Sequence, residues 1–268
     1  MNRFRILPGT TAVAVICTII FILTQVCGMA NQAEAVILCG AYYKPFILCG
    51  EYWRLLSAGF VHIGILHLAV NMMSLFNLGS FMEQKLGTFK YMTVLLCSVA
   101  GGSLFTFCMD GNTVSGGLSG GLYGLLAGFS LIIFSMDLAK VPAVRSALIR
   151  TYLICILINF MPSIAVSAHI GGYVTGLFLT GILSEDVRKK ISIVHLRTAA
   201  VLMLAVLCFF SWQRRNLPAG QYYLMSDYNI LKKESEIGMK NYAKNMAVRL
   251  DRLYDMEGTL EWLIGKED

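Results

Sequence analysis

The chain has 268 residues, of which 56% are hydrophobic and 14% are charged, and its formal net charge at pH 7 is +6. Because about a quarter of the residues of a soluble domain are charged, this composition and a mean hydropathy of +0.65 exclude an ordinary soluble protein. The sequence predicts an integral membrane protein surrounded by a lipid bilayer, and we expect no nucleic-acid partner.

Uncharged segments long enough to cross about 30 Å of hydrocarbon recur along the chain. They are residues 10–29, 55–81, 91–109, 118–136, a fifth segment that begins near Arg145, 165–183 and 194–212. A spanning segment must satisfy its backbone hydrogen bonds internally, and none of these segments alternates like the strands of a barrel. The sequence therefore predicts an all-α polytopic membrane protein with seven spanning helices.

No charged residue marks the boundary between the fifth and sixth segments, since none occurs between Arg150 and Glu185. That stretch is too long for one spanning helix of about 20 residues. Asn159, Pro162 and Ser163 mark the break, since proline and small polar residues interrupt apolar helices.

Lysine and arginine are distributed unevenly between the two sides of the predicted bundle. The ends assigned to the inner side carry Arg3, Arg5, Lys85, Lys90, Lys140, Arg145, Arg150, Arg188, Lys189, Lys190 and Arg197. The loops between segments on the other side carry only Lys44 and Arg54, so the positive-inside rule predicts a cytoplasmic amino terminus. An odd number of spans puts Arg214 and Arg215 outside, which weakens this interpretation without reversing it.

The start of the chain also resembles a signal peptide. Arg3 and Arg5 precede an apolar run, and Ala33-Glu34-Ala35 has the small-x-small form of a cleavage site. The apolar run is longer than a usual signal core, so we favour a retained membrane helix.

Four residues that can carry chemistry lie at the start of the even-numbered segments. The second, fourth and sixth segments all run from outside to inside, so their first turns lie at one depth near the outer face. His62, His67, Ser119 and His169 belong to those first turns. Because ionisable groups inside membranes are rare and tend to be functional, the pattern predicts a site near the outer leaflet.

The spacing within these segments indicates which side chains share a face. His67 and Asn71 are four residues apart and lie on one helix face, so they can reach one point together. Ser119 and Tyr123 are related in the same way. His62 is five residues from His67 and points elsewhere.

Glycines recur at four-residue spacing on the fourth and sixth segments. Gly120 and Gly124 lie on one face of the fourth segment, and Gly172 and Gly176 share a face of the sixth with His169. Small residues at this spacing let helix backbones approach closely in lipid. Such a contact between the two segments would bring the serine toward the histidine.

Several short motifs occur together and in a fixed order. They are Trp53-Arg54 before the second segment, His62-x4-His67-x3-Asn71 on it, Gly117-x-Ser119-Gly120 with Tyr123 on the fourth, and Ala168-His169-x2-Gly172-x3-Gly176 on the sixth. In this combination the chain resembles the rhomboid family of intramembrane serine proteases. A Gly-x-Ser-Gly motif alone is weak, since glycine is common in membrane helices, but the combination is specific. The resemblance covers about residues 1–185, and the seventh segment resembles family members that add one helix to a six-helix core.

The resemblance implies a serine–histidine dyad and no cofactor. Ser119 would attack a peptide carbonyl of a transmembrane protein substrate, with His169 as general base and then as general acid. No Asp or Glu lies within a predicted span, so we do not expect a carboxylate that orients His169. Asp110 and Glu51, in the outer loops, are the nearest candidates for that role.

The resemblance also assigns supporting roles. The oxyanion would be stabilised by His67 and Asn71 together with the backbone N–H of the serine at a helix amino terminus. The other motif positions are Gly117 in the serine motif, Tyr123 packed beside the histidine, and His62 in a structural or supporting role.

Beyond the core, the sequence predicts less. We divide the chain into a six-helix catalytic core (1–185), an inner loop with a seventh helix (186–212) and a polar, partly helical tail (213–268). The tail has apolar residues spaced for one face of a surface amphipathic helix, namely Met246, Leu250, Leu253, Leu260 and Ile264. Whether that helix contacts the membrane, the core or a partner stays open.

The eight cysteines form no CxxC motif and mostly lie in apolar runs, so we predict no metal site. Cys39 and Cys49 share one outer loop, where a disulfide remains an alternative.

Two rival functions stand beside the peptidase. A catalytically inactive rhomboid-like protein that binds membrane clients would lack the serine or the histidine, yet Ser119 and His169 are both present. A small transporter would show an internal repeat or charged, broken-helix sites near the bilayer midplane, and neither is evident. We therefore predict an intramembrane serine endopeptidase in a bacterial plasma membrane, with a cytoplasmic amino terminus and an active site toward the outer face.

Overall fold

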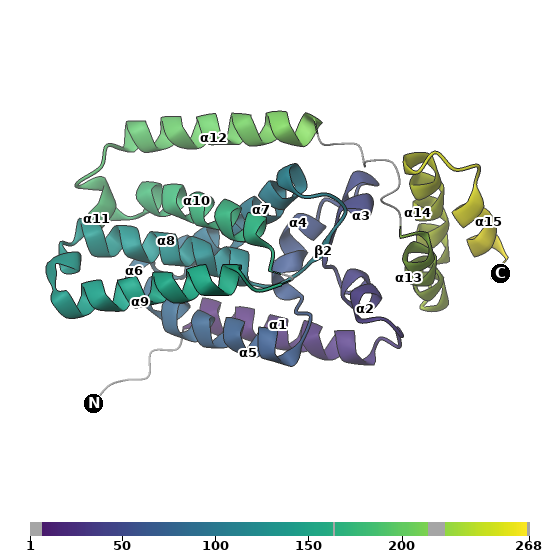
Figure 1. Cartoon of the computed structure of the whole chain (residues 1–268), viewed down its shortest axis with the longest axis horizontal. Coiled ribbons are helices and arrows are strands. Elements are labelled where there is room, and N and C mark those ends of the chain that lie inside the picture. The colour runs from purple at the N-terminus through teal and green to yellow at the C-terminus, as the bar shows by residue number, and fades with distance from the viewer. Residues whose placement is uncertain (1–6, 163, 214–222, 267–268) are drawn as a thin grey trace.

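The computed structural model describes residues 7–162, 164–213 and 223–266, and the secondary structure of these residues is helical apart from one pair of short strands (Figure 1). The α-helices are α1 (Pro8–Val26), α2 (Gln32–Leu38), α3 (Lys44–Leu48), α4 (Arg54–Ser57), α5 (Ile65–Ser74), α6 (Ser80–Leu86), α7 (Thr88–Met109), α8 (Ser119–Ser135), α9 (Pro142–Asn159), α10 (Val166–Leu183), α11 (Glu185–Arg188), α12 (Ile193–Gln213), α13 (Leu224–Glu236), α14 (Lys240–Leu253) and α15 (Thr259–Gly265). The remaining elements are the 3-10 helices η1 (Ala58–Phe60) and η3 (Leu138–Lys140), the π-helix η2 (Leu75–Gly79) and the strands β1 (Tyr42–Tyr43) and β2 (Val114–Ser115). Arg3, Arg5, Ser163, Arg214 and Arg215 lie outside the described residues.

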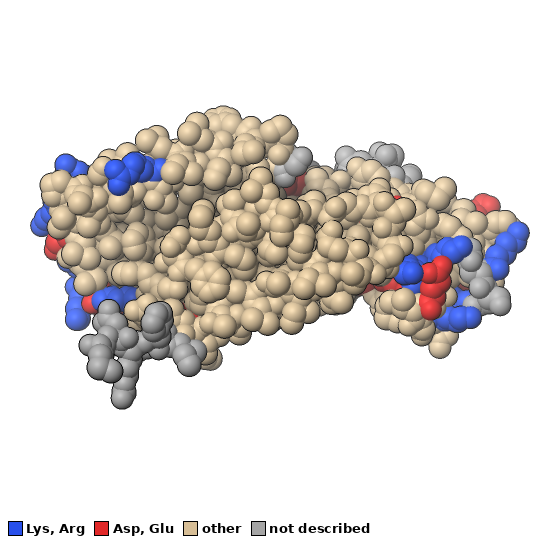
Figure 2. All heavy atoms as spheres, turned by 90° about the horizontal axis from the view of Figure 1, so that it is seen from below, with Lys and Arg blue, Asp and Glu red and all other residues tan. Residues whose placement is uncertain are grey.

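Within the described residues, six helices are long and apolar enough to cross a membrane, as expected of a multi-pass membrane protein. They are α1, the continuous helix Ile65–Leu86 built from α5, η2 and α6, and then α7, α9, α10 and α12. Helix α8 is apolar but shorter, at 17 residues. Figure 2 shows charged side chains gathered at two ends of the molecule, with an uncharged surface between them.

The predicted start of the second span at residue 55 is wrong. Residues 54–60 form two short helical elements, α4 and η1, and the spanning helix begins only at Ile65. His62 therefore precedes this helix and does not lie in its first turn. The absence of charge from 55 to 81 marked an apolar segment, but it carried no information about where the chain changes direction.

The second spanning helix also continues further than predicted, to Leu86, and so it contains Glu83. The expectation that no acid lies within a span is wrong at this position. The buried carboxylate of Glu83 accepts hydrogen bonds from the backbone N–H groups of Gly9 at 2.9 Å and Thr10 at 2.8 Å. These N–H groups belong to the amino end of α1, where the helix dipole favours a negative charge. Glu83 thus joins two helices at the end of the bundle opposite to the serine.

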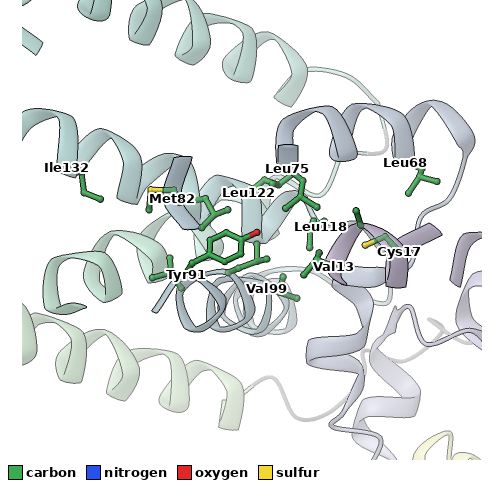
Figure 3. Close-up of a cluster of buried hydrophobic side chains, with 14 of the residues drawn as sticks. Val13, Cys17, Leu68, Leu75, Met82, Tyr91, Val99, Leu118, Leu122 and Ile132 are labelled. Carbon is green, nitrogen blue, oxygen red and sulfur yellow. The ribbon is translucent and has the colours of Figure 1, made fainter. Parts of the chain in front are cut away.

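A single apolar core cluster holds α1, the second spanning helix, α7 and α8 together. Figure 3 shows Tyr91 of α7, Met82 of α6 and Leu122 of α8 in this cluster. The ring of Tyr91 is fully buried, and the hydroxyl of Thr10 donates to the Tyr91 hydroxyl oxygen at 3.3 Å. The core therefore fixes α7 and α8, the helices before and after the loop that leads to Ser119.

Glycines bring α8 and α10 into backbone contact. A methyl group at Gly124 would lie 2.8 Å from the carbonyl oxygen of Gly172, and a methyl group at Gly172 or Gly176 would collide with the backbone of α8. Helix α7 approaches α10 in the same way, since a methyl group at Gly102 would lie 2.6 Å from the carbonyl oxygen of Ala168. Three helices are thus packed at close range, which sets the relative level of the first turns of α8 and α10.

The single amphipathic helix predicted in the tail is wrong. Helix α14 ends at Leu253 and α15 begins at Thr259, and the turn between them uses positive φ angles at Asp255 (55°) and Gly258 (73°). The apolar residues of the two helices face inward, because Met246 and Leu250 of α14 are buried at 2% and 0% exposure.

The tail packs on the loop that follows α1. Ile37, Tyr43 and Phe46 of this loop share one apolar cluster with Met246 and Leu250 of the tail. Figure 1 shows α13 and α14 beside α2 and α3, at one end of the helix bundle. Of the options left open for the tail, the structure therefore shows packing on the rest of the chain.

Candidate active site

Ser119 is the first residue of α8, and the loop before it is held from two sides. Gly117 has φ +137°, a conformation that favours glycine, and a methyl group there would lie 2.8 Å from Nε2 of His67. The Gly117 N–H donates to the carbonyl oxygen of Ala58 at 2.9 Å. Just upstream, β2 pairs antiparallel with β1. The loop therefore presents Ser119 at a helix amino terminus, where backbone N–H groups lack intrahelical partners.

The two histidines of the second segment have different positions. His62 lies in the loop before α5, and its Nε2 accepts a hydrogen bond from the N–H of Leu118 at 3.4 Å. His67 is the third residue of α5, and its ring packs against Gly117. The two imidazoles meet edge to face, with their centroids 5.2 Å apart. His62 thus supports the backbone next to the serine, and His67 covers the glycine of the serine motif.

Asn71 follows His67 by one helical turn and is buried at 4% exposure. Its Nδ2 donates to the backbone carbonyl of His67 at 2.8 Å. Among the described residues its Oδ1 is buried without a hydrogen-bond partner. The amide nitrogen is thus held against His67 and retains one further N–H that it can donate.

Ser119 and His169 come together, although they are 50 residues apart in the sequence. The Nε2 atom of His169 lies 2.8 Å from Oγ of Ser119. Tyr123, one turn after the serine, stacks on the imidazole, with ring centroids 4.0 Å apart and an interplanar angle of 9°. His169 is buried at 5% exposure, whereas Ser119 is half-buried. The arrangement can transfer a proton from a serine hydroxyl to an imidazole.

Asn159 is the site residue that our sequence reasoning missed. It is the last residue of α9, and its Oδ1 lies 2.6 Å from Nδ1 of His169. Its Nδ2 donates to the hydroxyl of Tyr123 at 2.8 Å and to the carbonyl oxygen of Cys155 at 2.9 Å. In the sequence, Asn159 marked only the break between two predicted spans. A polar side chain at the outer end of an apolar segment, at the expected depth of His169, was the signal available.

The acidic residues considered as partners of His169 have other contacts. Asp110 accepts a hydrogen bond from the hydroxyl of Ser167, two residues before the histidine. Glu51 forms a buried ion pair with Arg54, and it also accepts a hydrogen bond from the hydroxyl of Tyr242. In the described part of the chain, the group that contacts Nδ1 of His169 is an amide and not a carboxylate.

All cysteines of the described chain are free, including Cys39 and Cys49. The disulfide that the shared loop allowed is therefore not formed in this structure.

Comparison with known proteins identifies the family. A model of the Rhomboid domain matches residues 49–186, which include Ser119 and His169. The chain belongs to the rhomboid family. This rhomboid is 37% identical over 150 residues to RHOMBOID-like protein 5 of Arabidopsis thaliana, a match that covers 54% of this chain and 48% of the relative. It is 28% identical over 212 residues to Rhomboid protease GluP of Bacillus subtilis (strain 168), a match that covers 76% of this chain and 40% of the relative.

Family membership alone does not decide catalytic activity. Inactive RHOMBOID-like protein 8 of Arabidopsis thaliana is 32% identical over 138 residues, which is 51% of this chain and 39% of that relative. The chain also spans less than half the length of each of these three relatives. Whether this rhomboid is active therefore depends on the geometry of its own site.

Proposed function

We propose that this rhomboid is an intramembrane serine endopeptidase that cleaves other transmembrane proteins in or near their spanning helices. The observation that carries the proposal is the distance of 2.8 Å between Nε2 of His169 and Oγ of Ser119. At this distance the imidazole can accept the hydroxyl proton while the oxygen attacks a peptide carbonyl.

The reaction follows from the two side chains. Oγ of Ser119 bonds to the carbonyl carbon, and its proton moves to Nε2 of His169. His169 then gives that proton to the leaving amine as the C–N bond breaks, which leaves an acyl-enzyme. Water attacks the ester with His169 again as base, and the released proton restores the serine hydroxyl. The Ser119 N–H, with side-chain N–H groups of His67 and Asn71, supplies donors for the oxyanion.

The substrate class follows from the depth of the pair. A serine in the first turn of a membrane helix can reach peptide bonds only near the outer end of another spanning segment. An intact helix shields its own carbonyls in hydrogen bonds, so we expect cleavage at small, helix-loosening residues. Substrates are therefore membrane proteins with a weak helix end at the outer face.

We infer that α12 is a seventh span that crosses from the inner to the outer face. Before α12, Asp186 pairs with Lys85 at 2.9 Å and Lys190 pairs with Asp137 at 2.6 Å, next to the ends of α6 and α8. After α12, the tail packs on the loop that follows α1. These two regions lie at opposite ends of the bundle in Figure 1, and α12 runs along its length between them.

We assign the orientation of the bundle in the membrane from the charged residues at these two ends. The two cations of the outer loops are both buried at 1% exposure: Lys44 donates to the carbonyl oxygen of Phe107, and Arg54 to the carbonyl oxygens of Ile37 and Ala41. They are part of the loop structure, so among the described residues outside the tail, the surface lysines and arginines near the helix ends lie toward the other end of the bundle. We propose that this end is cytoplasmic, in a bacterial plasma membrane.

We propose that the chain consists of three successive units, which are the core (1–185), the inner loop with the seventh helix (186–212) and the tail (213–268).

The test is cleavage of a single-span substrate by the purified protein in liposomes. We expect activity in the wild type and loss of activity in Ser119→Ala and in His169→Ala. The matched controls are Ser135→Ala, at the other end of α8, and His195→Ala, an exposed histidine of α12; both should cleave normally. Cleavage that survives Ser119→Ala would contradict the proposal, and no cleavage by any form would favour a client-binding protein.

A further inference from the structure

We propose that Asn159 is a positioning residue that holds His169 in the tautomer needed by a general base, and that it makes the serine–histidine pair dependent on α9. The inference rests on the proposed peptidase function and extends it. Its starting point is the contact of 2.6 Å between Oδ1 of Asn159 and Nδ1 of His169.

The orientation of the Asn159 amide is fixed by a second contact. Its nitrogen lies 2.9 Å from the backbone carbonyl oxygen of Cys155, and a carbonyl oxygen can only accept a hydrogen bond. The NH₂ group must therefore face Cys155, and the amide oxygen must face His169. A reversed amide would place two acceptors against each other.

The tautomer of His169 follows from that orientation. An amide oxygen can only accept, so Nδ1 of His169 must carry the proton of the neutral ring. Nε2 then has a free lone pair, and this atom lies 2.8 Å from Oγ of Ser119. The chain of contacts from Cys155 through Asn159 thus leaves the imidazole in the one neutral form that can accept the serine proton.

Tyr123 completes the restraint on the ring. Its hydroxyl donates to the carbonyl oxygen of Cys155 at 3.1 Å and accepts from Nδ2 of Asn159 at 2.8 Å. Its ring stacks on His169 in nearly parallel planes. The stacking restrains tilting of the imidazole, and the hydrogen bond from Nδ1 to Asn159 restrains rotation within its plane.

An amide suits this position better than a carboxylate. The group sits at the end of a membrane helix, where an uncompensated charge is costly and a hydrogen-bonded neutral amide is less so. A neutral acceptor fixes orientation and tautomer without adding a negative charge beside the ring. The role of Asn159 is therefore to position His169.

The location of Asn159 links this role to α9. Of the residues of α9, only Leu148 is buried, so most of the helix surface faces outward. The helix is held by polar contacts, including those of the Tyr152 hydroxyl with Ser130 and with Tyr173, each 2.8 Å long. Asn159 is the last residue of this helix. A displacement of α9 would remove the acceptor from Nδ1 of His169 and slow proton transfer, as Asn159→Ala would.

The test compares Asn159→Ala with Tyr152→Phe in the purified full-length chain. Both changes remove polar contacts between α9 and its neighbours, but only Asn159→Ala removes a contact to His169. We expect Asn159→Ala to lower kcat by about a hundredfold, at the lower end of what general-base catalysis contributes, with little change in KM. Tyr152→Phe leaves the contact between Asn159 and His169 in place, so it should lower kcat far less than Asn159→Ala does. The melting temperatures of both variants report whether they fold.

A second measurement does not depend on turnover. The chain has 4 histidines, so ring ¹⁵N spectra of ¹⁵N-histidine protein can be assigned with single His→Ala variants. We expect an Nδ1–H signal for His169 in the wild type and in Tyr152→Phe, and a shift of the population toward Nε2–H in Asn159→Ala.

An unchanged tautomer in a folded Asn159→Ala variant, or kcat within about twofold of the wild type, would overturn the inference. The expected tautomer change in a protein that cleaves nothing would support the positioning role and contradict the peptidase function instead.

Discussion

The hydroxyl of Tyr43 donates a hydrogen bond of 2.7 Å to Oδ1 of Asp227, a residue 184 positions later in the chain. The other carboxylate oxygen of Asp227 accepts from the hydroxyl of Tyr254 at 2.6 Å. The Asp227 side chain is fully buried between the tail and the loop that follows α1. The tail is therefore bound to the outer loop through a carboxyl group that two phenols satisfy.

Replacing Tyr43 with phenylalanine should destabilise the docked tail. Asp227 would lose a donor, which we expect to lower the free energy of local unfolding of the tail by about 1–3 kcal/mol. Tyr42→Phe is the matched control, because the Tyr42 hydroxyl is buried without a partner among the described residues. Hydrogen exchange of α13 and α14 measures both effects. Equal losses in the two variants would show that the Tyr43 hydroxyl does not hold the tail.

The stability of the docked tail should fall as the pH rises. Burial raises the pKa of Asp227 to about 6 and that of Glu234 to about 7, from ordinary values of 3.8 and 4.5. The folded state thus binds these protons more tightly than the unfolded state. Their contribution to stability is fully present below about pH 4 and is lost as the pH rises through 6 to 7.

Hydrogen exchange of the tail at several pH values, corrected for intrinsic exchange rates, measures this dependence. We expect protection to decrease between pH 5 and pH 8 by about 1–3 kcal/mol, and Asp227→Asn to flatten the profile. Protection that increases over this range would contradict the assigned direction.

Gly172→Ala should disrupt the contact between α8 and α10. A methyl group there would collide with the backbone of Gly120, one residue after the serine, so we expect a loss of about 1–3 kcal/mol or more. Gly64→Ala is the control, because a methyl group at Gly64 meets no atom within 4 Å. Thermal unfolding in detergent reports the difference. An unchanged melting temperature for Gly172→Ala would mean that the two helices do not pack this closely.

Reporter fusions test the seventh span. We expect alkaline phosphatase fused after Gly265 to be active and fused after Arg188 to be inactive, because the enzyme matures only outside the cytoplasm. Green fluorescent protein at the same two positions should give the reverse pattern. The same result on both sides of α12 would exclude a crossing by this helix.

The sequence predicted the positions of the long apolar helices well and the polar contacts poorly. Apolar segments of about 20 residues are a strong local signal, so helices α1, α7, α8, α10 and α12 lie close to five of the predicted segments. The second span was placed too early, since the turns of α4 and η1 are as uncharged as the helix that follows them. Local composition reveals where a chain is apolar and not where it turns.

Most contacts between residues far apart in the chain could not be predicted from the sequence, because they depend on how the helices pack. From the sequence, Ser119 and His169 could be assigned to one depth, because both were placed in the first turns of segments that run in the same direction. Asn159 reaches the same imidazole from the end of a helix that runs in the opposite direction, and no spacing rule connects the two residues. Asp227 and Tyr43 were equally inaccessible to sequence patterns, because their pairing requires the tail to fold back on the outer loop.

The most direct test of the serine–histidine pair is covalent labelling with a fluorophosphonate probe, read by mass spectrometry. We expect the adduct on Ser119 in the wild-type protein and in His195→Ala, and loss of the adduct in His169→Ala, because the probe reacts with a serine activated by a neighbouring base. A wild-type protein that carries no adduct on Ser119, or equal labelling in His169→Ala, would contradict the assignment of these two residues as nucleophile and base.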